Sequence, residues 1–329
     1  MASIRDVAKQ AGVAACTVSR VLNGTASVAP ETKMRIEQAM KELDYIPNEL
    51  ARGMFLQKSG IIAMLVPSIK HPFFSSLADC IEKELYDHGY KLMLCSTSGS
   101  IERERDYLNM FRSNLVDGVI MAVNSLKEQD YVQFQKPMIM LDYALPGQVP
   151  FVVSDHKMGG ALAAEEFIRN GCRYVLHLCA EEEETKGKEV ISYDSHKELK
   201  RILEENQIRT RSVEIKWNDF DLKGYQELAE LILTSYPEID GIMAADMPAT
   251  AFLEAGIRLG RKVPEDLCIV AYDGTYVVDI TGVRLTAIVQ QLHLFSEEVV
   301  KMMLEYIEHP EILPESKYIP VKRRSGDTT

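Results

Sequence analysis

From residue 61 onward, the sequence alternates short continuous apolar runs with amphipathic helical stretches, and this alternation restricts the fold more than any other feature. The first half of this region contains the apolar runs IIAMLV, KLMLC and VDGVIMAV, separated by helical patterns such as FSSLADCIEKELYDHG. After Phe151 the pattern resumes with YVLHLC, GIMAA and CIVAY, again separated by helical stretches such as GGALAAEEFIRNG. Continuous apolar strands of this length are typical of a parallel sheet buried on both faces. The sequence therefore predicts two α/β lobes built on parallel sheets.

The length of the chain leaves room for a further small module before these lobes. With 329 residues, of which 46% are apolar and 26% charged, the chain has the composition of a folded multidomain protein. The longest apolar run, at residues 61–67, is too short to span a bilayer, and the N-terminal stretch MASIRDVAKQ lacks the apolar core of a secretory signal. We therefore expect a cytoplasmic protein that does not contact a membrane.

The sequence shows no motif of catalysis or metal binding. The six cysteines have neither CxxC nor metal-ligand spacing, so we expect reduced thiols and no metal site. There is no GxSxG, HExxH or P-loop motif, and MGGAL at residues 158–162 does not match the dinucleotide-binding GxGxxG pattern. We expect these glycines to open a helix that packs close to a crossover between the lobes. The sequence thus predicts neither an enzyme nor a cofactor.

The N-terminal segment has the pattern of two short helices joined by a tight turn. Ser3 and Asp6 have capping-box spacing, which predicts a helix from Ile4 onward. Gly12 stands where a left-handed C-cap would end this helix. The inner face of the first helix is formed by Ile4, Val7, Ala8 and Ala11, and that of the second by Val18, Val21 and Leu22. A helix-turn-helix between Ile4 and Asn23 follows.

The outer face of the second helix suits the major groove of DNA. It presents no acidic residue and consists of Cys16, Thr17, Ser19, Arg20 and Asn23. Arg20 can donate two hydrogen bonds to guanine, while the hydroxyls and Asn23 can hold phosphates. An ordinary solvated helix face is the alternative. A third helix, which closes an all-α headpiece, is predicted from Pro30 with Met34, Ile36, Ala39, Met40 and Leu43 on its inner face.

The net charge of −12 is distributed unevenly along the chain. Residues 1–58 hold eight Lys and Arg against six Asp and Glu, whereas the remaining residues hold 29 against 43. A polyanion is therefore compatible with the N-terminal segment and disfavoured elsewhere.

The run DVAKQAGVAACTVSRVLNG, followed by LDYIPNELARG, resembles the headpiece of the LacI/GalR family, and later matches extend over essentially the whole chain. This resemblance implies a transcriptional regulator in which Ala15, Cys16 and Arg20 read bases. Cys16 is interpreted as a small apolar filler rather than a redox switch. The DNA-binding residues expected from the resemblance are Ser3, Ile4, Ala14, Ala15, Cys16, Thr17, Ser19, Arg20, Asn23, Ala51 and Met54.

Residues 48–58 are predicted to form a hinge between the headpiece at 1–47 and the core at 59–329. Asn48 is a good N-cap, but the stretch up to Leu56 is too short to be a stable helix alone and Gly53 weakens it. In the family this helix forms on operator DNA and inserts an apolar wedge into the minor groove, and Met54 occupies the wedge position. The alternative is a plain linker with Met54 packed against the core.

The family's core resembles a periplasmic sugar-binding protein, with a ligand in the cleft between the lobes. One lobe is expected at residues 59–155 and 291–318 and the other at 156–290 and 319–329, with crossovers near Asp155, Gln290 and Tyr318. Phe73 and Phe74 either flank the ligand or are simply packed. The effector-binding residues expected from the family's positions are His71, Phe73, Phe74, Asp142, Tyr193, Phe220, Asp246, Asp273 and Gln290.

The sequence departs from the family's pattern on one wall of the cleft. The family places an arginine in the stretch that reads KGKEVISYDSHKEL here, and this stretch contains none. Lys186, Lys188 or Tyr193 are the candidates to replace it, although none reproduces a bidentate fork. Ala245 likewise stands where relatives carry asparagine.

The function expected from these observations is that of a homodimeric repressor on a palindromic operator, controlled by a small ligand, with a saccharide as the best candidate. The tail VKRRSGDTT has no leucine heptads, which favours a dimer. The alternative is a core regulated by a partner protein, as in the family's catabolite control protein. A plain solute-binding protein is the third possibility, and the headpiece disfavours it.

Overall fold

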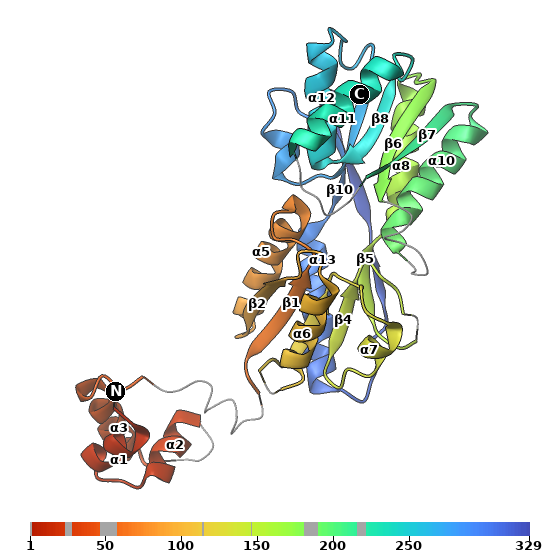
Figure 1. The fold of residues 1–329 in the computed structure, drawn as a ribbon. Coiled ribbons are helices and arrows are strands. Elements are labelled where there is room, and N and C mark those ends of the chain that lie inside the picture. The colour runs from red at the N-terminus through yellow and green to blue at the C-terminus, as the bar shows by residue number, and fades with distance from the viewer. Residues whose placement is uncertain are drawn as a thin grey trace. The chain divides into compact units, whose positions relative to one another are not determined.

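The computed structural model describes residues 2–23, 28–46, 58–113, 115–145, 147–180, 190–215 and 222–329 (Figure 1). It divides into two compact units, one formed by Met1–Ile61 with Ser113–Asp117 and the other by Ile62–Arg112 with Gly118–Thr329. None of the helices in these described ranges has the length and apolar character needed to cross a membrane.

The first unit contains the three predicted headpiece helices, α1 (Ile4–Ala11), α2 (Ala15–Asn23) and α3 (Pro30–Glu42). The capping box is confirmed, because the Ser3 hydroxyl accepts the Asp6 N–H and the Asp6 carboxylate accepts the Ser3 N–H at 2.8 Å. Gly12 ends α1 with φ 66°, a left-handed conformation that favours glycine. The local rules for helix ends therefore set both ends of α1.

A small apolar core holds the three helices together. Its buried members are Val7, Ala8, Ala11, Val18, Ile36 and Ala39. The predicted inner positions Val21, Leu22, Met40 and Leu43 pack against it while half-buried or at its edge. The prediction that Met34 lies on the inner face is wrong, because its side chain is 62% exposed. Two residues before Ile36 is about 200° around a helix, so Met34 falls on the opposite face from Ile36 and Ala39.

The second unit contains the two predicted α/β lobes. In the first lobe the strand order is β11-β5-β4-β3-β1-β2, and the pairs β1–β3, β3–β4, β4–β5 and β5–β11 are parallel. The strands are β1 (Ile61–Val66), β2 (Lys91–Ser96), β3 (Gly118–Met121), β4 (Met138–Leu141), β5 (Phe151–Ser154) and β11 (Lys317–Ile319). The helices of this lobe are α5 (Pro72–Asp87), α6 (Ile101–Phe111), α7 (Glu128–Val132) and α13 (Leu292–Glu308).

The second lobe repeats the design with the order β12-β10-β9-β8-β6-β7, in which only the β10–β12 pair is antiparallel. Its strands are β6 (Tyr174–Ala180), β7 (Arg209–Ile215), β8 (Gly241–Ala245), β9 (Cys268–Asp273), β10 (Thr286–Gln290) and β12 (Val321–Arg324). Its helices are α8 (His156–Arg169), α10 (Asp194–Glu205), α11 (Leu222–Ser235) and α12 (Asp246–Arg258), with 3-10 turns η1 (Ile191–Tyr193) and η2 (Tyr276–Asp279).

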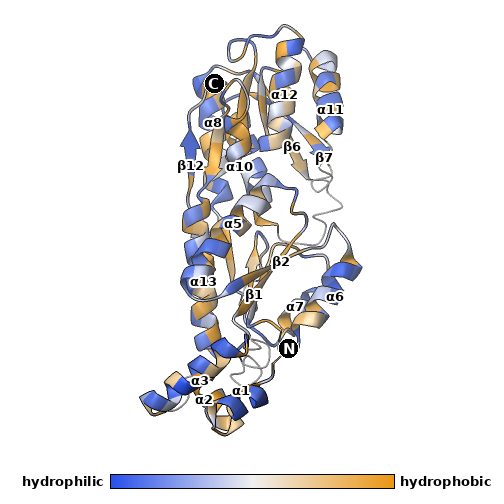
Figure 2. Cartoon of the chain, turned by 90° about the vertical axis from the view of Figure 1, so that its left-hand side faces the viewer, coloured by the Kyte–Doolittle hydropathy of each residue, from blue (hydrophilic) through white to orange (hydrophobic). Residues whose placement is uncertain are grey.

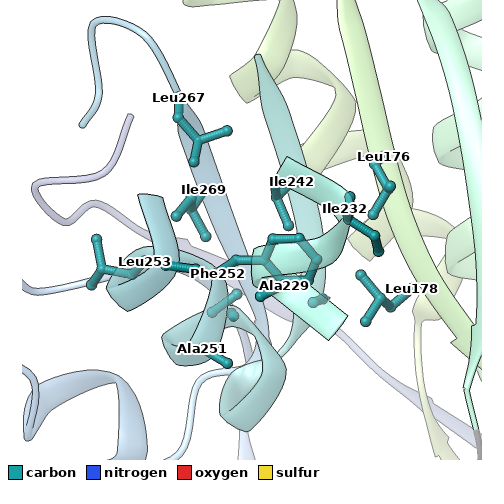
Figure 3. Packing of buried hydrophobic residues seen from close by; sticks show 14 of the residues in the cluster. Leu176, Leu178, Ala229, Ile232, Ile242, Ala251, Phe252, Leu253, Leu267 and Ile269 are labelled. Atoms are coloured by element: carbon teal, nitrogen blue, oxygen red, sulfur yellow. The ribbon is translucent and has the colours of Figure 1, made fainter. Parts of the chain in front are cut away.

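Each lobe buries a continuous apolar core between its sheet and its helices. In the first lobe, side chains of α5 and α13 pack together on β1, β3, β4 and β5, although α13 lies more than 200 residues after α5 (Figure 1). In the second, α11 and α12 cover one face, where aliphatic side chains such as Ile242 and Ile232 surround the ring of Phe252 (Figure 3). The strands are accordingly hydrophobic, while hydrophilic residues colour much of the helices (Figure 2).

The chain passes between the sheets at three points where described strands and helices meet. β5 ends at Ser154 in the first sheet and α8 begins at His156 in the second lobe. β10 ends at Gln290 and α13 begins at Leu292, and Pro320 separates β11 from β12. The predicted glycine-opened helix is confirmed as α8, because a Cβ on Gly159 would overlap the Tyr272 hydroxyl and one on Gly160 would overlap the Ser195 carbonyl oxygen. These glycines let α8 approach β9 and α10 closely.

Candidate nucleic-acid interface and ligand cleft

The second headpiece helix presents a short exposed face. Ala14, Cys16 and Arg20 are exposed, while Ala15 packs partly against the headpiece core. Helix α2 contains no acidic residue, so nothing on the helix itself repels a phosphate backbone. Arg20 therefore has the freedom to reach a base edge.

The other polar residues of this face are less exposed than the sequence predicted. Thr17, Ser19 and Asn23 are half-buried, and the Asn23 amide donates to the Ser19 hydroxyl at 3.2 Å. A bond of this kind holds both side chains on one face of the last turns of α2, a geometry that suits phosphate contacts.

Ser3 and Ile4 lie at the start of α1, and their roles differ. Ser3 is exposed, but its hydroxyl is engaged in the capping box with Asp6, to which it also donates at 2.7 Å. These hydrogen bonds lower the pKa of Asp6. Ile4 is half-buried against the headpiece core. The expected DNA contacts of Ala51 and Met54 lie outside the described residues.

A cavity lies between the lobes of the second unit at the carboxyl ends of strands β8 and β9. It is small and partly open to solvent. Two residues of the first lobe and seven of the second surround it: His71, Pro72, Ile215, Tyr225, Ala245, Asp246, Met247, Pro248 and Asp273. The polar groups are few and the remaining wall is apolar or aromatic, as in sites for small polar ligands.

Three of the predicted effector residues, His71, Asp246 and Asp273, thus lie together around this cavity. His71 caps the N-terminus of α5, and its Nδ1 accepts the Phe73 N–H at 3.1 Å. Burial lowers the pKa of His71 to about 4, so the ring is neutral at pH 7. A neutral ring whose Nδ1 accepts carries its proton on Nε2.

The two aspartates of the second lobe are almost completely buried. Burial raises the pKa of Asp246 to about 6, and burial together with the nearby Asp246 carboxylate raises that of Asp273 well above its ordinary value. The Asp246 carboxylate accepts the N–H groups of Gly274 and Thr275 at 3.0 and 2.6 Å and the Thr275 hydroxyl at 2.6 Å. Asp246 therefore fixes the loop after β9 in addition to lining the cavity.

Gln290 links the base of the cavity to the crossovers. Its amide donates to Asp273 Oδ1 at 2.7 Å and its carbonyl oxygen accepts the Ser154 hydroxyl at 2.7 Å. All three side chains are buried. Gln290 does not line the cavity, so the contact with Asp273 is what connects it to a ligand.

Asp142, directly after β4, and Asp273, the last residue of β9, have strained backbones. Their φ angles are 66° and 100°, a region that residues other than glycine seldom adopt. Each such residue costs on the order of 1–3 kcal/mol, and such strain clusters at ligand sites.

The remaining effector predictions do not meet at the cavity. Phe73 and Phe74 are half-buried against the core of the first lobe, with their rings edge to face at 5.3 Å, which is the packed alternative. Tyr193 lies in η1 with its ring 5.7 Å from that of His196. Phe220, Lys186 and Lys188 lie outside the described residues.

Sequence reasoning missed several residues of the cleft. Met247 and Pro248 directly follow Asp246, so their place beside it could have been predicted from chain continuity. Ile215 and Tyr225 belong to β7 and α11, and only the tertiary packing brings them there. His156, the first residue of α8, was also missed although it lies 3.3 Å from Asp142.

Two family models match the chain. Residues 3–48 match the model of the bacterial regulatory proteins of the lacI family, and residues 164–329 match that of the periplasmic binding protein-like domain. Among solved structures, the lac repressor dimer bound to operator and the anti-inducer ONPF has a TM-score of 0.86 at 22% identity and covers 99% of this chain and 98% of its own, which is a likeness of fold. A LacI family regulator from Enterococcus faecalis V583 with bound ribose has a TM-score of 0.71 at 25% identity, covering 82% of this chain and 98% of its own.

Curated relatives align over the full length of the sequence. The ribose operon repressor of Halalkalibacterium halodurans is 33% identical over all of this chain and 97% of its own length. The sucrose operon repressor of Streptococcus mutans is 31% identical over all of this chain and 99% of its own length. With its lacI-type headpiece and its periplasmic-binding-protein-like core, the chain belongs to the LacI family of bacterial transcriptional regulators.

Proposed function

We propose that this protein is a transcriptional repressor that binds a palindromic operator as a homodimer and is controlled by a sugar in the cleft between the lobes. The observation that carries the DNA-binding part is the exposed face of α2, with Arg20 free of acidic neighbours on its helix. A twofold-symmetric dimer would present two such helices to two half-sites, which requires a palindrome.

The cleft supports a sugar as the controlling ligand. His71, Asp246 and Asp273 supply hydrogen-bonding groups, while Ile215, Tyr225 and other apolar residues supply the wall that a sugar ring packs against. Two relatives are named ribose and sucrose operon repressors, and one structural neighbour contains ribose. We take ribose as the first ligand to test.

We infer that the hinge at residues 48–58 carries the effect of the sugar to the headpiece, with Met54 as the wedge in the minor groove. A change in lobe angle that shifts a marginal hinge helix needs a coupling free energy of only about 1–3 kcal/mol. A core regulated by a partner protein instead would not respond to any sugar. Titrating the full-length chain with ribose, sucrose and other sugars, and following its melting temperature, separates the two possibilities.

The DNA-reading role of α2 is tested with Arg20→Ala on duplexes selected from a randomised library by the full-length protein. We expect preference at one base pair of each half-site to relax by about 1–3 kcal/mol. Arg35→Ala is the matched control, because Arg35 is an exposed arginine on α3 of the same headpiece. The control should lose affinity modestly and equally on every sequence. If Arg20→Ala also weakens all sequences equally, base reading by Arg20 is refuted.

A further inference from the structure

Three side chains form a line that connects the two lobes beside the cleft. Asp142 follows β4 of the first lobe, His156 begins α8 directly after a crossover, and Tyr272 lies in β9 of the second lobe. His156 Nε2 lies 3.3 Å from Asp142 Oδ1, and His156 Nδ1 lies 2.8 Å from the Tyr272 hydroxyl. Nε2 of the imidazole therefore contacts the first lobe, and Nδ1 contacts the second.

The protonation of the buried Tyr272 decides which groups donate and which accept along this line. His156 is 4% and Tyr272 8% exposed, and their rings stack with centroids 5.8 Å apart. Burial and the charge of Asp273 keep the pKa of Tyr272 well above its ordinary value, so its hydroxyl keeps its proton. When this hydroxyl donates to Nδ1, the ring N–H is on Nε2, facing Asp142.

Asp142 also joins the lobes through its backbone. Its carbonyl oxygen accepts the Ile191 N–H at 3.1 Å, and Tyr143 forms an isolated antiparallel bridge with Val190. Its Oδ1, in contrast, is buried and has no well-formed hydrogen bond within the part of the chain that the structure describes. The 3.3 Å approach of His156 is therefore a weak contact for this oxygen, and a ligand donor to the 35% exposed side chain of Asp142 would displace it.

At its other end the line meets the network that holds the crossovers. Tyr272 precedes Asp273, which lines the cavity and accepts the Gln290 amide, and Gln290 in turn holds Ser154 at the end of β5. Ser154 and Gln290 are the last residues of the strands that precede two of the three crossovers. A shift of the Tyr272 hydroxyl would therefore act on both of these crossovers. The packing around this hydroxyl is close, because even a Cβ on Gly159 of α8 would overlap it.

We propose that His156 is a positioning residue that couples occupancy of the cleft to the arrangement of the lobes, an inference that rests on the proposed sugar-binding function. A sugar hydroxyl that donates to the Asp142 carboxylate, whose side chain is 35% exposed, draws this carboxylate away from His156 Nε2. The imidazole then shifts against Tyr272, and the lobes rearrange at the crossovers. His156 thus transmits binding without itself holding the sugar.

Two amide replacements test the roles of the two His156 nitrogens separately. The side-chain amide of asparagine falls near Nδ1, where its carbonyl oxygen accepts the Tyr272 hydroxyl, so His156→Asn keeps a partner for Tyr272 but cannot reach Asp142. The amide of glutamine falls near Nε2, so His156→Gln keeps the contact with Asp142. His177→Gln is the matched control, because His177 is a second buried histidine of the same lobe, 3% exposed, paired with His196 and Ser212.

The measurement is the ratio of the operator dissociation constants of the full-length protein with and without saturating ribose, on a palindromic duplex that the protein has selected. Allosteric coupling in general changes an affinity by a factor on the order of 5 to 150. We expect both His156→Asn and His156→Gln to bring the ratio close to one, because each variant keeps only one of the two contacts that the coupling needs. We expect His177→Gln to lower the melting temperature while leaving the ratio unchanged, which separates coupling from stability.

An unchanged ratio in His156→Asn would overturn the inference. If that variant does not fold, Tyr272→Phe decides, because it removes only the hydroxyl: a reduced ratio supports the coupling and an unchanged ratio overturns it. A wild-type protein that binds DNA but responds to no sugar would refute the proposed sugar control, and the inference with it. If the wild type and His156→Asn respond equally to a sugar, the inference about His156 is refuted, while the proposed sugar control stands.

Discussion

Replacing Ile36 by alanine should unfold much of the headpiece while leaving the core folded. Ile36 is completely buried, and its truncation removes three carbon atoms from a cluster of only six buried residues. At about 0.8 kcal/mol per buried CH2, transfer alone costs roughly 2.4 kcal/mol. The cavity left behind brings the total to about 2–5 kcal/mol.

This loss is large for so small a module. A folded unit of this length has a free energy of unfolding of roughly 2–7 kcal/mol, at about 0.05–0.15 kcal/mol per residue. Ile36→Ala therefore removes from about a third to all of it. The matched control is Met34→Ala on the same helix, where the side chain is 62% exposed and the expected change is within about 0.5 kcal/mol.

Hydrogen exchange of the full-length chain, read by mass spectrometry on peptides from α1, α2 and α3, measures this loss directly. We expect protection in Ile36→Ala to fall by about two orders of magnitude, whereas peptides from β1 and β9 serve as references and keep theirs. Equal protection of the Ile36→Ala and Met34→Ala headpieces would refute the assigned core. Loss of protection in the references as well would refute the division into two units.

Two further predictions concern the second lobe. Because the folded state raises the pKa of Asp246 from 3.8 to about 6, it binds a proton more tightly than the unfolded state, and stability should fall as the pH rises from about 4 to 6. Asp246→Asn should flatten this fall in thermal melts across that range, and a slope as steep as that of the wild type would argue against the buried carboxyl. Gly160→Ala should lower the free energy of unfolding in urea by about 1–3 kcal/mol, because the added Cβ would overlap the Ser195 carbonyl. Gly282→Ala is the control and should be nearly neutral, because its Cβ meets open space. Similar unfolding midpoints for the two variants would contradict the close packing of α8.

The headpiece was predictable because its signals are local. A capping box, a glycine at a left-handed C-cap and a proline in the first turn each act within four residues, and Ser3, Gly12 and Pro30 all do so in the structure. Met34 is exposed because it lies about 200° around α3 from Ile36, so its apolar character alone did not indicate the buried face. The parallel sheets were predictable for a similar reason, since burial on both faces leaves a continuous apolar run.

The cleft was only partly predictable because it is assembled from distant segments. His71, Asp246 and Asp273 were found because each follows or precedes a recognisable strand or helix. Tyr225 and Ile215 carry no local signal that distinguishes them from core residues, and the packing of α11 and β7 decides their place. His156 was missed because a histidine at the start of a helix is usually a solvated or capping residue, whereas here the crossover buries it between the lobes.

The most direct test of the central claim, that the exposed face of α2 makes this protein a sequence-specific regulator, is one affinity ratio. The dissociation constants of the full-length protein are measured at 150 mM salt for its selected palindromic duplex and for a scrambled duplex of the same length and composition. The proposed function predicts that the selected duplex is bound at least on the order of 10³-fold more tightly. Equal affinity for the two duplexes would contradict it.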